Sequence, residues 1–339
     1  MTNKIPLFIN KSIILLVSKS ILNASFMLLL TFIWLNLNIT FGDEILLIQI
    51  TSSIKRLILK LDYKPESKDF LFINVAYDRE LIDKIDENNF IIGNQDITDR
   101  KKLSNLFHIL NQKENSYKFI LCDIFFEDIS PNDSLLYYEM NKMNNIIISY
   151  HKENGVYSSP IFPVSKGLSD YTTSDTYGTF LKFKLVIDQS IKTTPLIMYE
   201  KINKIEYKKK NIFNMLNGKL CLNSIIVNLR IRNFDLVKKE NTYNYIHLGE
   251  LLSLPTSFIK ELSKDRIIII GDFEERDMHK TTMGDMAGSL ILLNTYLALV
   301  NEDNIISIDF IMLLLIGYFM ISLFYFYKKR KEWVIIKVM

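Results

Sequence analysis

Residues 265–304 read DRIIIIGDFEERDMHKTTMGDMAGSLILLNTYLALVNEDN, and this stretch decides the fold. Four consecutive isoleucines, Ile267 to Ile270, form a run without polar alternation. Such a run is typical of a strand that is buried on both faces of a parallel sheet. Gly271 ends the strand, and we expect a polar loop from Asp272 to Thr282. Small and apolar residues at helical spacing then predict a helix from Met286 to Val300.

The composition describes an ordinary folded chain. It has 339 residues, of which 48% are hydrophobic, and a net charge of +3. This length can bury the core of one large domain or two ordinary ones. The dense basic runs, Lys208 to Lys210 and Lys328 to Lys331, do not gather on one predicted face, and the second directly follows an apolar segment. We therefore expect no nucleic-acid binding.

Two segments are long enough to cross a bilayer, which requires about 20 apolar residues in a helix. Ile21 to Phe41 carries no formal charge, and Ile305 to Tyr327 carries only Asp309. The predicted organisation is a cytoplasmic N-terminus, a transmembrane helix, an extracytoplasmic domain, a second transmembrane helix and a cytoplasmic tail. These parts are residues 1–19, 20–41, 42–304, 305–327 and 328–339.

The charges beside the two apolar segments predict their orientation. Basic residues precede the first segment and follow the second, while acidic residues follow the first: Lys4, Lys11 and Lys19, then Lys328, Lys329, Arg330 and Lys331, against Asp43 and Glu44. Because basic residues favour the cytoplasmic side, both termini are expected to be cytoplasmic. The main domain would then be periplasmic, on a bacterial inner membrane. A signal peptide cleaved before Asp43 is the alternative, but its apolar region would be shorter, about 7–15 residues.

Cys122 and Cys221 both belong to the part that is predicted to be extracytoplasmic, where a disulfide could form. Cys122 falls within an apolar strand, FILCDIFF, in which a free thiol is an ordinary core residue. We therefore expect both cysteines to be free and buried.

Between the spans, strands and helices alternate. Phe70 to Ala76 is the first strong strand, Leu103 to Leu110 shows helical spacing, and Lys118 to Phe126 is a second buried strand. A helix is expected from an N-cap at Ser130 to about Lys142, followed by a strand from Asn145 to Tyr150. This alternation predicts an α/β fold with a mainly parallel sheet flanked by helices.

The remaining segments are assigned more coarsely. Residues 47–61 have the spacing of an amphipathic helix. Residues 151–194 form a looser insertion with a short strand at 180–187. A helix is predicted for 195–205, a strand for 224–229 and a short helix for 248–254.

Several of these segments carry the motifs of a known family. They include VAYD at 75–78, CDIFFE at 122–127, the helix start with Pro131, Asp133 and Leu135 that leads to Asn145, and the strand end at Val227 and Asn228. The most specific is IIIIGDFEERDMHKTTMG at 267–284, with Gly288 and Asn294 in the following helix. The chain resembles the second type of CHASE domain, an extracytoplasmic sensory module attached to histidine kinases, cyclases and protein kinases.

The resemblance implies a sensory function, and the departures from the family qualify it. Thr282 stands where the family usually has proline, and Leu292 where it often has histidine. The family usually continues into several membrane spans and a cytoplasmic output domain, whereas this sequence ends twelve residues after the second span. We therefore expect no cytoplasmic output domain here, and a protein partner that carries the signal.

Acidic residues follow the predicted parallel strands, and ligands bind at the carboxyl ends of such strands. Asp78, Asp123, Glu127, Asp272 and Asp277 are the candidates, and of these Asp78, Asp123, Glu127 and Asp277 are the predicted ligand-binding residues. A hard-cation site or an acid/base pair is one interpretation. The other, which we favour, is that Asp123 and Asp277 accept hydrogen bonds from backbone N–H groups of adjoining loops.

The histidines and cysteines show no metal-ligand spacing, and the chain has no phosphate-binding loop or nucleophile motif. We expect no catalytic residues, no metal and no cofactor. The sequence thus predicts a non-enzymatic, membrane-anchored sensory or ligand-binding protein that acts through a partner. A structural or assembly subunit of a cell-envelope complex is the alternative, and a carboxylate-dependent hydrolase is a third possibility.

Overall fold

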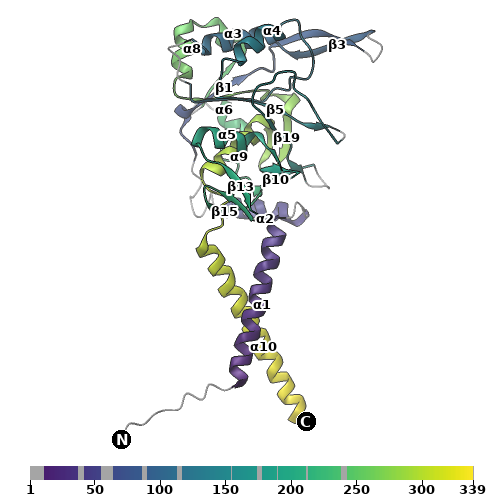
Figure 1. Cartoon of the computed structure of the whole chain (residues 1–339), viewed down its shortest axis with the longest axis vertical. Coiled ribbons are helices and arrows are strands. Elements are labelled where there is room, and N and C mark those ends of the chain that lie inside the picture. Colours follow the sequence, from purple (N-terminus) through teal and green to yellow (C-terminus); the bar gives the residue numbers. More distant parts are fainter. Residues whose placement is uncertain are drawn as a thin grey trace. The chain divides into compact units, whose positions relative to one another are not determined.

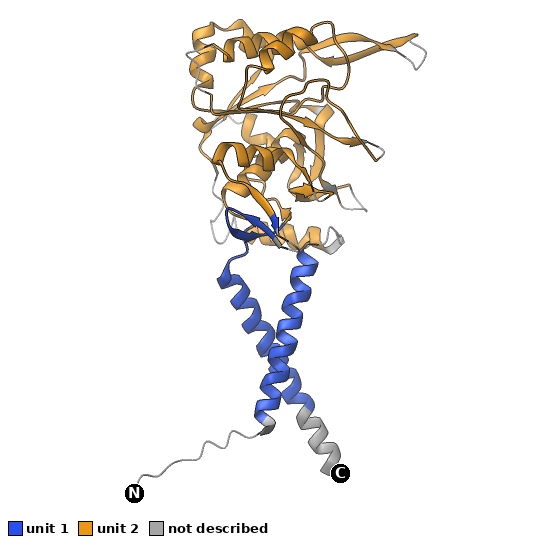
Figure 2. Ribbon diagram, in the orientation of Figure 1, with its two compact units in different colours: residues 1–38, 209–222, 305–339 blue, residues 39–208, 223–304 orange. Residues whose placement is uncertain are grey.

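The computed structural model describes residues 11–36, 42–54, 64–85, 90–112, 117–153, 155–173, 178–188, 190–210, 213–237 and 243–338. The chain divides into two compact units (Figure 2). Unit 1 comprises residues 1–38, 209–222 and 305–339, and unit 2 comprises residues 39–208 and 223–304.

Unit 2 is built on a six-stranded sheet with the order β17-β1-β18-β4-β5-β8. All neighbouring strands in it are parallel. The strands are β1 (Phe70–Asn74), β4 (Phe119–Cys122), β5 (Ile146–Tyr150), β8 (Lys166–Leu168), β17 (Asn244–His247) and β18 (Ile267–Gly271). The isoleucine run lies in β18, between β1 and β4, and every residue of these three strands is buried. The predicted α/β fold and parallel sheet are confirmed.

Helices cover both faces of this sheet (Figure 1). One face is covered by α3 (Arg100–Leu110), α4 (Asp133–Met140), α7 (Leu248–Ser253) and α8 (Thr256–Ser263), whose apolar residues join the core around Ile268 and Ile270. The other face packs against α5 (Thr194–Asn203) and α9 (Gly288–Val300). All residues of α9 from Gly288 to Leu299 are buried, as expected for a helix that is apolar all round.

A second, mixed sheet contains β9 (Thr172–Thr173), β10 (Phe180–Lys184), β16 (Ser224–Ile226), β19 (Met278–Thr281) and β20 (Gly284–Ala287). The expected loop at 272–282 was therefore partly wrong. It contains a short 3-10 turn at Glu275–Asp277 and then β19, which pairs with β20 and with β10. The helix that follows begins at Gly288 rather than at Met286, because Met286 lies in β20.

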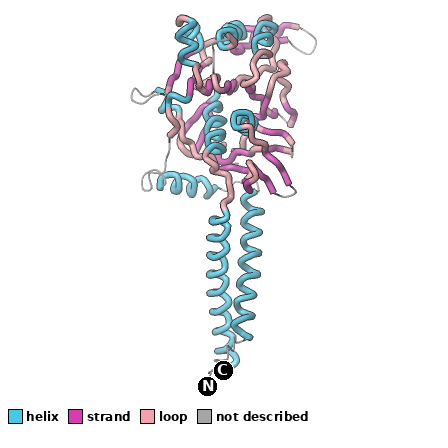
Figure 3. Tube along the Cα trace, turned by 60° about the vertical axis from the view of Figure 1, so that its left-hand side comes forward, coloured by secondary structure: helices cyan, strands magenta, loops and turns pink. Residues whose placement is uncertain are grey.

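Shorter elements complete unit 2. They are the helix α2 (Gly42–Ser53), a 3-10 turn at Ser67–Asp69, the helix α6 (Asn233–Val237), and the hairpins β2 (Arg79–Ile85) with β3 (Ile91–Thr98), β6 (Lys152–Glu153) with β7 (Val156–Tyr157), and β11 (Val186–Ile187) with β12 (Ile191–Lys192). Helix α2 overlaps the expected amphipathic helix at 47–61, of which residues 55–61 lie outside the described residues. Figure 3 separates helices and strands by colour.

The start of α4 differs from the expected one. Asn132, not Ser130, is the residue before the first helical turn, and Ser130 instead belongs to a preceding turn. The Asp133 carboxylate accepts a hydrogen bond from the Ser130 backbone N–H at 2.6 Å, and the Ser130 hydroxyl accepts one from the Asn132 N–H at 3.1 Å.

Unit 1 contains two long helices, α1 (Lys11–Asn36) and α10 (Ile308–Val338), and a hairpin of β14 (Phe213–Leu216) with β15 (Lys219–Cys221). Strand β13 (Tyr207–Lys210) spans the boundary in the sequence between unit 2, which includes Lys208, and unit 1, which includes Lys209. By length and composition α1 can cross a membrane over 13–35 and α10 over 308–329. Within an apolar stretch of 18 residues, only 11% of α1 and 6% of α10 are buried, whereas the core helix of a soluble protein is mostly buried.

The two long helices contact each other through polar side chains as well as apolar ones. The Asn23 amide donates to the Ser322 hydroxyl at 2.8 Å, and the hydroxyls of Thr31 and Tyr318 lie 2.7 Å apart. Such interhelical bonds satisfy polar groups that would otherwise face hydrocarbon. The helix α1 starts and ends before the expected span at 20–41, of which residues 37–41 lie outside the described residues.

Candidate functional site

The carboxyl ends of β1, β18 and β4 open onto a cleft of about 270 Å³ in unit 2. Its charged lining comes from the segments after these strands and from the hairpin of β2 and β3. The residues are Arg79, Asp96, Asp123, Asp128, Asp272, Arg276 and Asp277. Because parallel strands end at the same edge, side chains that are far apart in the sequence meet there, as the sequence pattern predicted.

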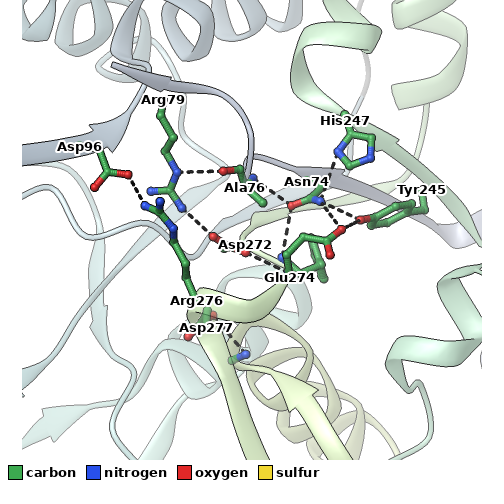
Figure 4. A network of polar contacts seen from close by, with 12 residues as sticks. Asn74, Ala76, Arg79, Asp96, Tyr245, His247, Asp272, Glu274, Arg276 and Asp277 are labelled. Carbon is green, nitrogen blue, oxygen red and sulfur yellow. Dashed lines mark hydrogen bonds and ion pairs between the residues drawn. The ribbon is translucent and has the colours of Figure 1, made fainter. Parts of the chain in front are cut away.

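Both arginines of the cleft are paired (Figure 4). Arg79 donates to the Asp272 carboxylate at 2.6 Å and to the Ala76 carbonyl at 3.1 Å. Arg276 donates to the Asp96 carboxylate, and this bond lowers the pKa of Asp96. The two ion pairs join the hairpin to the segment after β18, so they fix the sides of the cleft.

Asp277 fulfils the structural role that the sequence suggested. One carboxylate oxygen accepts a hydrogen bond from the backbone N–H of Gly288 at 3.1 Å, at the first residue of α9. The other lies 2.9 Å from His279 Nε2. The His279 ring in turn packs edge-on against Tyr171, with the ring centroids 5.2 Å apart.

Asp123 behaves differently. Its backbone N–H donates to the Ile270 carbonyl, but among the described residues no backbone N–H donates to its carboxylate, so the expectation of such a bond was wrong. Burial, followed by the negative charge of Asp277, raises the pKa of Asp123 to about 7. The neighbouring Ser149 hydroxyl and His279 act in the opposite direction. Asp123 is thus a carboxyl group that can gain or lose a proton near neutral pH.

The other two predicted residues lie outside the cleft. Asp78 is only 4% exposed, accepts from Lys102 Nζ at 2.6 Å, and accepts from the backbone N–H of Gly249 at 3.0 Å. It therefore holds the starts of α3 and α7. The Glu127 carboxylate lies 3.1 Å from His151 Nδ1. A turn in which the Asp78 N–H donates to the Val75 carbonyl separates Asp78 from the cleft.

Sequence reasoning missed Arg79 and Asp96 because the hairpin of β2 and β3 was not predicted. It missed Arg276 because its partner, Asp96, lies in that hairpin. The signal of the hairpin was available in DENN at 86–89, a group of turn-forming residues between two short segments that contain isoleucine. Among the described residues, no group of three or more His, Cys, Asp or Glu side chains is placed to hold a metal ion.

The parallel sheet and the cleft at the carboxyl ends of its strands belong to one α/β domain. In the sequence, a long apolar helix precedes this domain and another follows it. Residues 24–324 match the family model described as CHASE2 domain, and the chain belongs to this family of extracytoplasmic sensory domains. The match includes residues 24–36 of α1 and residues 308–324 of α10 as well as the α/β domain. Searches of curated proteins and of solved structures found no match.

Proposed function

We propose that the chain is a non-enzymatic sensory protein of the bacterial inner membrane, and that its periplasmic domain binds a small polar ligand carrying an ammonium group. The observation that supports this ligand class is which charged side chains of the cleft already have an ion-pair partner. Arg79 and Arg276 already have carboxylate partners, whereas no lysine, arginine or backbone N–H in the described part donates to Asp123. An ammonium group would complement that carboxylate.

The proposal of a non-enzymatic function is supported by the contacts of the other carboxylates in the cleft. Asp277 is held by Gly288 and His279, Asp272 by Arg79, and Asp96 by Arg276. A general acid and base would need a pair of groups that are both available to a substrate. Asp128 accepts a hydrogen bond from the Gln95 amide at 2.8 Å, which leaves Asp123 as the carboxylate in the described part of the cleft that no lysine, arginine or amide side chain holds.

The membrane placement rests on the two apolar helices, the family and the charges beside the helices. We infer that both termini are cytoplasmic and that the CHASE2 domain is periplasmic.

Action through a protein partner is supported by the hairpin of β2 and β3. Leu81 is 72% exposed, Phe90 69%, Ile91 64% and Ile92 58%, although apolar side chains of this size are usually covered. The same surface would suit the alternative, a subunit of an envelope complex. Cross-linking in cells followed by purification separates the two: a signalling protein supports sensing, and a stoichiometric multisubunit assembly supports the alternative.

The ligand class is tested by calorimetry on the full chain in nanodiscs, with ethanolammonium, 1,4-diaminobutane and acetate as probes. We expect saturable binding of the cations, not of acetate, and weaker binding below pH 7 because Asp123 becomes protonated. Asp123→Asn should abolish binding, while Glu261→Gln on α8 should not change it. If neither cation bound, or if binding were the same in Asp123→Asn, the proposed ligand class would be wrong.

A further inference from the structure

A second pocket lies on the other side of the segment that follows β18. Its volume is about 470 Å³, which is within the range of about 300–1,000 Å³ that small-molecule sites occupy. The walls come from α6, β17 and the segment after β18, and they are mainly apolar: Phe234, Leu236, Val237, Phe273 and Met278. Asn233, Tyr245 and Glu274 contribute polar groups to this lining.

The segment after β18 supplies carboxylates to both sites (Figure 4). Asp272 lines the cleft and pairs with Arg79, while Glu274, two residues later, lines the apolar pocket. A hydrogen bond from the Glu274 backbone N–H to the Asp272 carboxylate, 2.9 Å long, fixes the turn between them. This bond fixes the backbone at Glu274, whose side chain lines the apolar pocket.

Glu274 has only neutral partners in the described part of the chain. Its Oε1 accepts from the Asn74 amide and from the Tyr245 hydroxyl, both at 3.2 Å. These bonds are longer than the roughly 2.7–2.9 Å of a charge-assisted bond from a cationic nitrogen. Burial, and then the charge of Glu274, raises the pKa of Tyr245, so the hydroxyl remains a neutral donor. No lysine or arginine of the described part pairs with Glu274.

An uncompensated carboxylate in the wall of an apolar pocket selects its ligand by charge. We propose that this pocket binds a small organic cation with an apolar or aromatic body, whose ammonium group pairs with Glu274. The rings of Tyr245 and Phe273, with centroids 5.8 Å apart and nearly perpendicular, line the same end of the pocket. Aromatic faces add attraction for a cation there, while Phe234, Leu236 and Met278 receive the apolar body.

This site is separate from the cleft of the proposed function. The cleft presents Asp123 among charged and polar side chains, whereas the pocket presents Glu274 among apolar ones. The two sites should therefore respond to different ligands and to different substitutions.

The test uses two probes of similar size and opposite charge, 2-phenylethylammonium and 3-phenylpropionate, titrated into the full chain in nanodiscs. Empty nanodiscs correct for partition into lipid. We expect saturable binding of the cation, at least tenfold tighter than any binding of the anion. Glu274→Gln keeps the size and an acceptor oxygen but removes the charge, and it should weaken the cation at least tenfold. Glu261→Gln is the matched control on α8 and should leave the affinity unchanged.

A second variant covers the case in which Glu274→Gln does not fold. Met278→Trp fills the pocket and should abolish binding of the cation without removing the carboxylate. Asp123→Asn should leave binding of 2-phenylethylammonium intact, so failure at the cleft and failure at the pocket are distinguishable. Absence of saturable binding, equal binding of the two probes, or no effect of either pocket variant would each overturn the proposal.

Discussion

The Asp277 carboxylate accepts a hydrogen bond from the backbone N–H of Gly288 at 3.1 Å. This contact links the turn after β18 to the first residue of α9, where backbone N–H groups have no partner within the helix. It also explains the glycine: a Cβ at position 288 would lie 2.7 Å from one oxygen of Asp277. Carboxylate and glycine therefore form one structural unit at the carboxyl edge of the sheet.

Replacing Asp277 by alanine should destabilise the domain. A hydrogen bond to a charged group contributes about 1.5–3 kcal/mol, and the partly exposed position of Asp277 places the loss toward the lower value. We expect a melting temperature several degrees lower for the full chain in detergent. Asp285→Ala removes an exposed acid from β20 and is the matched control. Equal melting temperatures for the two variants would show that the contact is not stabilising.

Replacing Asn294 should destabilise the domain more than replacing Asp277. Asn294 is fully buried in α9, and its Oδ1 accepts from the backbone N–H groups of Arg230 and Ile231 at 2.7 and 3.0 Å. Asn294→Leu keeps the volume but leaves both N–H groups unsatisfied, at about 1–3 kcal/mol each. Thermal unfolding should show a large loss of stability or no folded protein. Asn301→Ala, at the end of the same helix, should change the melting temperature only slightly.

The cysteines should be unreactive in the folded chain. Both are free and buried, and burial raises the pKa of each thiol, that of Cys221 to about 12. Because the thiolate is the reactive form, a maleimide added to native protein at pH 7.5 should label neither residue within minutes. Both should be labelled after denaturation without a reductant. A linked peptide pair containing Cys122 and Cys221 in the mass spectrum would contradict this.

Membrane orientation can be tested with a reporter that is active only outside the cytoplasm. Fusion at about Lys208 should give signal because that position follows the first span and precedes the second. Fusion after Lys331 should give none, because the basic residues after the second span favour the cytoplasm. Signal from the second fusion would reverse the proposed orientation of the C-terminus.

The parts of the fold that the sequence predicted are those with strong local patterns. The isoleucine run at 267–270 predicted a strand buried on both faces, and the structure places it between β1 and β4 in the parallel sheet. The hairpin at 79–98 escaped prediction because its strands are largely exposed and their apolar residues do not alternate with polar ones. Met286 was assigned to a helix because its strand is defined by pairing with β19, which propensity does not report.

For the site residues, too, the sequence predicted only those contacts that are made to nearby segments of the chain. Asp277 could be interpreted correctly because its partner, Gly288, lies in the first turn of the predicted helix from Met286 to Val300. Asp78 could not, because its partners Lys102 and Gly249 come from distant parts of the sequence. Arg79 and Arg276 reach the cleft only through the tertiary fold.

The last prediction concerns Asp123 and pH. Its pKa in the folded chain is raised from 3.8 to about 7, first by burial and then by the charge of Asp277. Between these pH values the folded chain retains a proton that the unfolded chain has released. The free energy of unfolding therefore falls as pH rises through this window, by at most about 1.4 kcal/mol per pH unit. The contribution is fully present below about pH 4 and lost above about pH 7.

Asp123→Asn isolates this effect because asparagine resembles the protonated acid and does not titrate. Wild-type and variant chains should have similar melting temperatures near pH 4, and the variant should become progressively the more stable one up to about pH 7. Melting curves at pH 4, 5, 6, 7 and 8 measure the difference. Because Asp277 is the second cause of the raised pKa of Asp123, Asp277→Asn should move the transition to lower pH. A difference between wild type and Asp123→Asn that stayed constant from pH 5 to 8 would show that Asp123 does not titrate in this range.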